Sequence, residues 1–250
     1  RNPRGLSCGP MSALVDELAN GNVAGSAPTV HGPTVATRVS KRAIDVVLGS
    51  ILVVVCAPVV LVLAAVLAVQ LRGWPFFAHH RVGEGERRLW FPKLRTLPRS
   101  TPVYADKTPQ LIQPVSGLAR FLRRSHLDEL PQLVLVPLGQ LSLVGPRPMM
   151  PHEFEGSDRT WRRERLAVRQ GCTGLWQVGH GQSLRVKDSP EFDAAYVRHL
   201  TVRLDLWIMW RTLSQFGGGS GVCLDDVPAW LWRAPRPVAA RDLAGSDLDP

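Results

Sequence analysis

The pattern of apolar and polar positions begins with a segment that has no period. Residues 1–38 mix Gly, Ser, Pro, Asn and small apolar residues, and we expect a tail with little order. A different pattern follows, because Val46 to Val69 is apolar throughout and carries no charged side chain. As a straight helix this run would be about 36 Å long, against a hydrocarbon core of about 30 Å. The run therefore predicts a membrane helix.

Pro58 interrupts this run and removes one backbone hydrogen bond, so it predicts a kink or break. Basic residues flank the run on both sides, and the positive-inside rule then places both ends on the cytoplasmic face. A re-entrant hairpin that turns at Pro58 satisfies this rule. A single span with a tolerated proline kink is the alternative, and the residues alone leave both open.

Beyond residue 72 the pattern alternates between short strands, helices and loops. Leu89–Leu97 is expected to pair back on an earlier strand. Leu204–Leu213, which carries two tryptophans, is either an amphipathic helix at the membrane interface or an ordinary core helix. The other expected elements are a loop over 101–115, a helix over Leu118–Leu130, a rigid loop at Gly145–Pro148, a helix over Arg159–Arg169 and two helices within Phe192–Leu213.

Charge adds a preference for anionic partners. The 250 residues carry a net charge of +9 and a pI near 10.2, which favours nucleic acid, anionic lipid headgroups or phosphorylated substrates. No P-loop, dinucleotide fingerprint or metalloprotease motif occurs in the sequence. His79-His80 and His152-Glu153 lack the spacing of metal ligands, and we interpret them as surface or packing residues.

Asp128-Glu129 is the acidic pair with the most chemical potential. It stands among arginines, and a carboxylate near cations stays ionised, so it could act as a nucleophile or hold a divalent cation. The alternative is structural, since Ser125 and Asp128 match the spacing of a helix capping box.

Cations of several segments are candidates for phosphate binding. Arg147 lies between two prolines after Gly145, so its guanidinium sits on a stiff loop suited to bidentate phosphate recognition. Arg81, Lys93 and Arg95 follow the membrane segment and would bind lipid headgroups or a diphosphate. A solvated turn and simple headgroup contact are the alternatives for these two groups.

Together these segments resemble one family, the bacterial sugar transferases, which are monotopic polyprenyl-phosphate phosphoglycosyl transferases. The resemblance covers roughly residues 41–215. The segments that carry it, in family order, are Lys41–Asp45, Pro58, Arg81–Gly83, Lys93–Thr96, Phe121–Arg124, Leu127–Leu133 (L-D-E-L-P-Q-L), Ser142–Pro148 (S-L-V-G-P-R-P), Thr173–Val178, Asp193, Tyr196 and Leu204–Leu206.

The resemblance implies a reaction and roles for residues. A nucleotide sugar, usually a UDP-sugar, gives its sugar-1-phosphate to a polyprenyl (undecaprenyl) phosphate, and UMP is released. On the matching positions Asp128 is the nucleophile, Glu129 and Asp128 hold Mg²⁺, and Arg147 binds phosphate, with Arg81, Lys93 and Arg95 as further phosphate ligands. Because the family is monotopic, the resemblance also favours the re-entrant hairpin at Pro58.

The chain departs from the usual family residues outside the Asp-Glu pair and the Gly145–Pro148 loop. The departures bear on nucleotide or sugar binding rather than on the chemistry at Asp128. They lie at Ala57, Ala78–His80, Leu135, Gln170 and Gly179–Gly181. Larger members carry extra transmembrane helices before this domain, so a small member or a trimmed piece is expected.

We therefore expect an α/β fold, mostly helical with a small sheet, at the cytoplasmic face of a bacterial inner membrane. The expected division is a disordered tail (1–38), a re-entrant membrane helix (39–72), a phosphoglycosyl transferase domain (73–215) and a flexible tail (216–250). Expected partners are a UDP-sugar, a polyprenyl phosphate and the membrane, but no nucleic acid, and a homo-oligomer is left open. The competing class is a non-catalytic membrane-surface scaffold that binds anionic lipid or recruits glycan enzymes.

Overall fold

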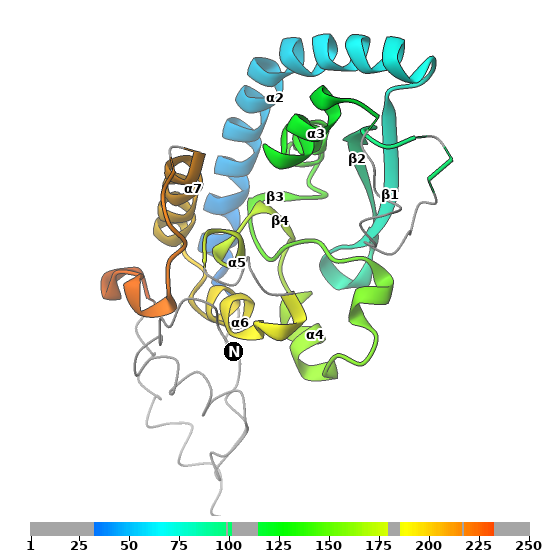
Figure 1. The fold of residues 1–250 in the computed structure, drawn as a ribbon. Coiled ribbons are helices and arrows are strands. Elements are labelled where there is room, and N and C mark those ends of the chain that lie inside the picture. Colours follow the sequence, from blue (N-terminus) through cyan, green and yellow to red (C-terminus); the bar gives the residue numbers. More distant parts are fainter. Residues whose placement is uncertain (1–32, 99, 102–114, 180–185, 217, 233–250) are drawn as a thin grey trace, which may run out of the picture.

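The computed structural model describes residues 33–98, 100–101, 115–179, 186–216 and 218–232. Most of the expected N-terminal tail and of the expected loop 101–115 lies outside these residues. The described part is mostly helical with two small sheets, which confirms the expected fold class (Figure 1). Its principal elements are α2 (Val35–Leu71), β1 (Phe76–Val82), β2 (Arg88–Leu94), α3 (Gly117–Arg124), the 3₁₀ helix η2 (Leu127–Leu135), β3 (Ser142–Val144), α4 (Arg159–Arg165), β4 (Gly171–Thr173), α5 (Leu175–Val178), α6 (Pro190–His199) and α7 (Val202–Phe216).

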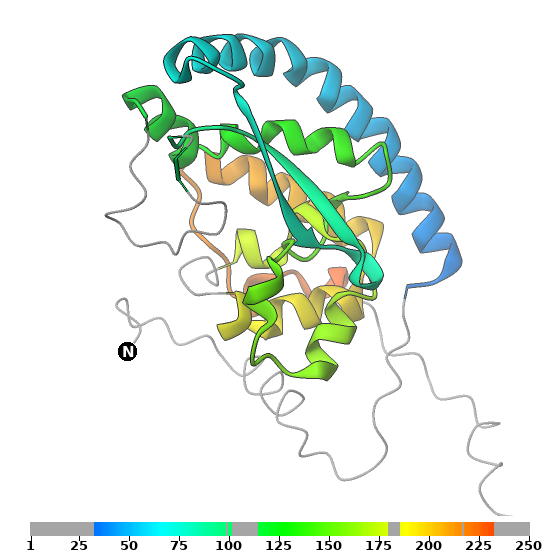
Figure 2. The same ribbon diagram turned by 90° about the vertical axis from the view of Figure 1, so that its right-hand side faces the viewer.

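The apolar run forms a single helix, α2, which begins four residues before the expected boundary at residue 39. Thr34 caps it, accepting a hydrogen bond from the backbone N–H of Thr37 at 3.2 Å. The axis of α2 changes direction within the helix, so its second part passes over α3 (Figures 1 and 2). Pro58 lies inside the helix and removes one of its hydrogen bonds, the usual cause of such a bend.

The structure does not show whether α2 is re-entrant, and α2 has no chain-reversing turn at Pro58. The helix continues through Pro58, because losing one backbone hydrogen bond bends a long helix without ending it. Its most apolar 18-residue window has a mean hydropathy of 3.2 and is 11% buried, so α2 is long and apolar enough to cross a membrane. How α2 enters a membrane stays a prediction.

Polar side chains fasten the first part of α2 to the rest of the protein. Lys41 donates to the Val144 carbonyl at 2.8 Å and forms an ion pair with Asp205 at 2.6 Å. Arg42 donates to two carbonyls at the end of η2, Val136 at 2.7 Å and Pro137 at 2.6 Å. The basic residues that the sequence placed at the membrane flank are therefore used, at these two positions, inside the protein.

Asp45 and Gly49 complete this docking face one and two turns further along. The buried Asp45 carboxylate accepts from the backbone N–H of Leu143 at 2.9 Å and from the Ser142 hydroxyl at 3.1 Å. A Cβ at Gly49 would lie 2.7 Å from a methyl group of Val136, so a larger residue would push α2 away. Residues spaced by four thus form one helix face.

Two small sheets position the loops of the site. β1 and β2 form an antiparallel hairpin with Phe76 opposite Leu94 and Val82 opposite Arg88, as the sequence predicted (Figure 2). β3 and β4 pair in parallel, with Ser142 aligned to Gly171. The main core packs between them and includes Phe91, Leu141, Tyr196 and Leu204.

The second part of α2 has its own small core. Ala64 and Leu67 are buried against Leu94 of β2 and against Ala119 and Leu122 of α3. Val60, Leu63 and Leu71 pack partly against this core, whereas Leu61, Val62 and Val69 are exposed.

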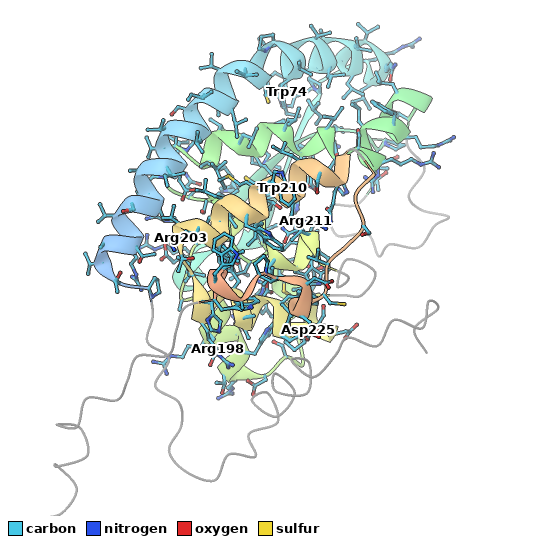
Figure 3. All side chains as sticks on the ribbon, turned by 90° about the vertical axis from the view of Figure 1, so that its left-hand side faces the viewer. Trp74, Arg198, Arg203, Trp210, Arg211 and Asp225 are labelled. Atoms are coloured by element: carbon cyan, nitrogen blue, oxygen red, sulfur yellow. The ribbon has the colours of Figure 1, made fainter. Side chains whose placement is uncertain are left out.

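At the C-terminal end, α7 has one buried and one exposed face. Leu204 and Ile208 are fully buried, whereas Trp210 and Leu213 are 59% and 69% exposed. Figure 3 shows the exposed face, with the Arg211 guanidinium beside the Trp210 ring, 5.7 Å from its centroid. The helix is therefore amphipathic, and whether its outer face meets a membrane stays a prediction.

The expected flexible tail 216–250 is only partly described. Within it, residues 221–232 pack on the main core, and Val227 and Leu231 are 3% and 1% exposed. A short apolar pattern after the glycines gave too little signal to predict this packing.

Removal of the Lys41 charge should destabilise the docking of α2. In Lys41→Met, Asp205 stays buried without its cation, and a broken buried ion pair costs about 3 kcal/mol, which lowers the melting temperature by roughly 6–12 °C. Thermal unfolding in detergent micelles measures this shift. The exposed Arg38 on the same helix provides the matched control, and Arg38→Met should shift the transition by only about 1–2 °C. Equal shifts for the two variants would contradict the docking role.

Candidate active site

Asp128 lies in the first turn of η2, directly after a sharp change of chain direction. α3 ends at Arg124, and His126 has a positive φ of 57° that turns the chain into η2. The Ser125 hydroxyl bonds back to the carbonyls of Phe121 at 2.9 Å and Leu122 at 3.3 Å, so it ends α3 instead of capping η2. The capping-box alternative for Asp128 is therefore wrong.

The Asp128 carboxylate is buried but has no partner. Asp128 is 7% exposed, and its side chain accepts no hydrogen bond from any residue that the structure describes. Burial raises the pKa of Asp128, and Lys93 and Arg123 oppose this effect. A carboxylate that accepts no hydrogen bond from the described residues keeps its oxygen lone pairs available for attack on an electrophile.

Glu129, the neighbouring carboxylate, has in contrast one oxygen in contact with cations. It forms an ion pair with Lys93 of β2, and an Arg147 nitrogen lies 4.0 Å from the same oxygen. Burial acts to raise the pKa of Glu129, but Lys93, Arg147 and Arg81 together outweigh it and lower the pKa to about 2. Burial also lowers the pKa of Lys93, against the effect of Glu129. The two adjacent acids thus have opposite pKa shifts.

Arg147 stands on the loop that follows β3. Gly145 begins this loop, and a Cβ there would overlap the carbonyl oxygen of Arg169, so only glycine fits. The Gly145 N–H donates to Thr173 of β4 at 2.8 Å. The Arg147 side chain is 28% exposed, and its guanidinium lies between Glu129 and Trp176, 5.9 Å from the ring centroid.

The structure places the other predicted phosphate ligands differently. Arg81 is 7% exposed and donates to the carbonyl of Pro148 and to His79, so its side chain holds the loop. Lys93 lies in the cluster through Glu129. Arg95 lies 5.1 Å from the Phe77 ring centroid and forms no ion pair with any described residue. The structure therefore brings together Asp128, Glu129, Arg147, Lys93 and Arg81, but not Arg95.

The donor set fits a magnesium ion. Mg²⁺ in phosphate-transfer sites binds one or two carboxylates and completes its octahedron with water and substrate oxygens. Asp128 offers a carboxylate without a partner, and Glu129 lies next to it with one oxygen outside the Lys93 contact. Among the described residues no group of three acidic, His or Cys side chains gathers to hold a metal. Substrate oxygens would have to supply the remaining ligands.

Sequence reasoning did not predict the buried residues whose hydrogen bonds support the loop of Arg147. Arg165 of α4 forms a buried ion pair with Asp193 of α6 at 2.7 Å and donates to the Arg147 carbonyl. His79 is a packing residue, as expected, but it also accepts a hydrogen bond from Arg81 at 3.0 Å. The helical period could have indicated Arg165, because in a helix of 3.6 residues per turn this arginine of α4 lies on the side that faces the core.

Comparison with known families places most of the chain in one family. The model of the family described as bacterial sugar transferase matches residues 36–218, so the chain belongs to that family. It is accordingly a member of the phosphoglycosyl transferase enzymes, whose curated relatives include UDP-sugar:undecaprenyl-phosphate sugar phosphotransferases.

Individual relatives are distant. The chain is 30% identical over 190 residues to the exopolysaccharide production protein ExoY of Rhizobium meliloti, covering 70% of this chain and 84% of ExoY. It is also 30% identical over 184 residues to the UDP-glucose:undecaprenyl-phosphate glucose-1-phosphate transferase of Klebsiella pneumoniae, covering 70% of this chain but 39% of that protein. An Aeromonas hydrophila transferase named for UDP-N-acetylgalactosamine is 28% identical, with 72% and 44% covered. The chain thus spans less than half of these two transferases.

The lowered pKa of Glu129 predicts an acid-dependent loss of stability. Its stabilising charge is fully present above the ordinary glutamate pKa of 4.5 and is lost as the pH falls towards about 2. Glu129→Gln should therefore be less stable than the unmodified protein at pH 7, on the order of 3 kcal/mol at most, and the difference should shrink between pH 4.5 and 2. Melting temperatures across this pH range provide the measurement. The exposed Glu155 offers the control, and a pH-independent difference for Glu129→Gln would contradict the assignment.

Proposed function

We propose that the protein transfers a sugar-1-phosphate from a UDP-sugar to a polyprenyl phosphate, releases UMP and so begins the assembly of a lipid-linked glycan or exopolysaccharide. The observation that supports this most directly is the buried, unpartnered Asp128 beside a cluster of cations. A carboxylate approaches an anionic diphosphate only where fixed positive charge offsets the repulsion. Lys93 and Arg123 act on Asp128, and Arg147 lies beside the neighbouring Glu129.

The reaction proceeds in two displacements at one phosphorus. An Asp128 oxygen attacks the β-phosphorus of the UDP-sugar, the bond to the bridging oxygen breaks, and UMP leaves with that electron pair. The phosphate oxygen of the lipid then attacks the same phosphorus, and the bond to Asp128 breaks. The products are the polyprenyl diphosphate sugar and the regenerated carboxylate, so no external acid, base or reductant is needed.

The charged neighbours of Asp128 divide the remaining work. Arg147 binds the phosphate that develops charge, since its planar guanidinium suits bidentate contact with phosphate oxygens. Lys93 keeps Glu129 ionised and oriented. Asp128 and Glu129 would hold Mg²⁺ together with the substrate diphosphate, and the ion would neutralise phosphate charge.

The membrane placement follows from α2. The helix offers a long exposed apolar surface, and its docking residues hold the domain of Asp128 next to it. A long-chain lipid phosphate resides in the bilayer, so an active site at the surface reaches it without extracting the lipid. We propose attachment at the cytoplasmic face of a bacterial inner membrane, where nucleotide sugars are available, with α2 re-entrant.

Release of UMP from a panel of UDP-sugars tests the reaction. With polyprenyl phosphate and Mg²⁺, the detergent-solubilised protein should release UMP from at least one sugar, and Asp128→Asn should lower the rate by about 10³-fold or more because the amide is not a nucleophile. The exposed Asp225 provides the matched control, and Asp225→Asn should keep full activity. A folded protein that releases no UMP from any UDP-sugar would favour the scaffold function instead. A fully active Asp128→Asn would refute the role of Asp128 as nucleophile.

The raised pKa of Asp128 predicts how the rate of the first displacement falls at low pH. Protonation removes the nucleophile, so UMP formation falls as the pH drops through this pKa, and the midpoint should lie above the ordinary aspartate value of 3.8. Single-turnover UMP release without lipid phosphate is the measurement, because the titration of the lipid phosphate then plays no part. A midpoint at or below 3.8 would contradict the role of Asp128.

A further inference from the structure

Two buried arginines reach the loop of Arg147 from opposite sides. Arg165 of α4 donates from Nη2 to the carbonyl oxygen of Arg147. Arg81 of β1 donates from Nη1 to the carbonyl oxygen of the next residue, Pro148. The two successive carbonyls that follow the Cα atom of Arg147 are therefore held by two separate guanidinium groups.

Arg165 is committed to this contact by its surroundings. Its side chain is fully buried, and its Nε donates to the Asp193 carboxylate at 2.7 Å, so its charge is balanced inside the protein. Its guanidinium also lies near two rings, 5.9 Å from the centroid of Phe154 and 5.5 Å from that of Trp161. No path from solvent to this side chain remains, which separates Arg165 from direct phosphate binding.

Arg81 has a corresponding partner in His79. The Arg81 Nε donates to Nε2 of His79 at 3.0 Å, and the guanidinium lies 4.9 Å from the centroid of Phe91. His79 is 3% exposed and packs with the rings of Phe77 and Phe91. Burial, with Arg81 and Lys93, lowers the pKa of His79 to about 3, so the ring stays neutral and Nε2 remains an acceptor.

Burial of two guanidinium groups costs free energy unless hydrogen bonds and ion pairs offset the loss of hydration. Both donate to the backbone of a loop already stiffened by Pro146 and Pro148, and the Val82 N–H adds a third bond, to the Met149 carbonyl at 2.9 Å. The carbonyls of residues 147–149 are thus all fixed. The element they surround, Arg147, carries the one side chain of this loop that lies near Glu129.

We propose that Arg165, held by Asp193, and Arg81, held by His79, are positioning residues that fix the Arg147 guanidinium beside Glu129, the sequence neighbour of Asp128. This inference rests on the proposed function, in which Arg147 binds the transferred phosphate. Arg81 thereby changes from a phosphate ligand, as the sequence suggested, to a support of one. Displacement of a substrate-binding group by about 1 Å is enough to cost about 10²-fold in rate.

A double-mutant cycle separates positioning from an independent role. Arg165→Lys keeps the charge opposite Asp193, but an ammonium cannot also reach the Arg147 carbonyl as the guanidinium fork does. We expect a loss of about 10- to 100-fold in kcat/KM for UMP release, with the UDP-sugar that the unmodified protein uses. In the Arg147→Met background the same change should cost less than about threefold, because the side chain that it positions is absent.

Arg163 supplies the matched control for this cycle. It is an exposed arginine on the same helix, and Arg163→Lys should leave kcat/KM unchanged in both backgrounds. Equal losses for Arg165→Lys with and without Arg147 would overturn the proposal, since they would show that Arg165 acts independently.

The His79 side of the proposal is tested by a conservative pair of variants. His79→Gln retains an acceptor for the Arg81 Nε and should keep kcat/KM within about threefold, whereas His79→Leu removes the acceptor and should lose about tenfold or more. Equal activity of the two variants, with equal melting temperatures, would overturn the role of His79. This pair keeps the proposal testable if Arg165→Lys does not fold.

Hydrogen exchange tests the positioning role of Arg165 separately from the proposed sugar-phosphate transfer. In the ligand-free protein, Arg165→Lys should raise exchange of the amides at Gly145, Arg147 and Met149 by about tenfold or more, while α2 and β2 keep their protection. Unchanged exchange at these amides would overturn the positioning role even if UMP is released. Raised exchange in a protein that turns over no UDP-sugar would leave the structural clamp supported and the proposed function refuted.

Discussion

The structure depends on how a long apolar helix is fastened to a basic, water-facing domain. Apolar contact alone gives little direction, because most of α2 is exposed and free of neighbours in the protein. Lys41, Arg42 and Asp45 supply that direction through hydrogen bonds to backbone groups of η2 and β3. Since η2 carries Asp128 and β3 leads into the loop of Arg147, the same contacts that orient α2 also tie it to both parts of the candidate active site.

The opposite shifts of the two adjacent acids have one electrostatic origin. Both are buried, which penalises their charged forms, but only Glu129 has an ion pair with Lys93 and lies next to Arg147. Glu129 is thereby a fixed charge, and Asp128 retains the reactivity that an ion pair would take away. The two neighbouring acids differ because the cations around them are placed asymmetrically, and this difference suits the proposed roles of Glu129 as support and Asp128 as nucleophile.

The sequence predicts what local patterns determine. The length and apolar character of Val46–Val69 indicated α2, and the expected pairing of Leu89–Leu97 with an earlier strand is found in the hairpin of β1 and β2. The pairing of Arg165 with Asp193, 28 residues apart, and of Lys41 with Asp205, 164 residues apart, was outside its reach, because no local period encodes a contact across the fold. For the same reason the local match of Ser125 and Asp128 to a capping box was misleading, since His126 turns the chain between them.

Net positive charge is therefore a poor guide to where anions bind. Arg42, Arg81 and Arg165 each donate to backbone carbonyls, and Lys41 and Lys93 pair with carboxylates of the protein itself. Arg147 differs from them, because its guanidinium is partly exposed and its nearest carboxylate oxygen lies at 4.0 Å. A cationic side chain on a rigid backbone, with a charge that is not fully balanced, is suited to bind a substrate phosphate. The buried cations make this possible by holding the backbone on which it stands.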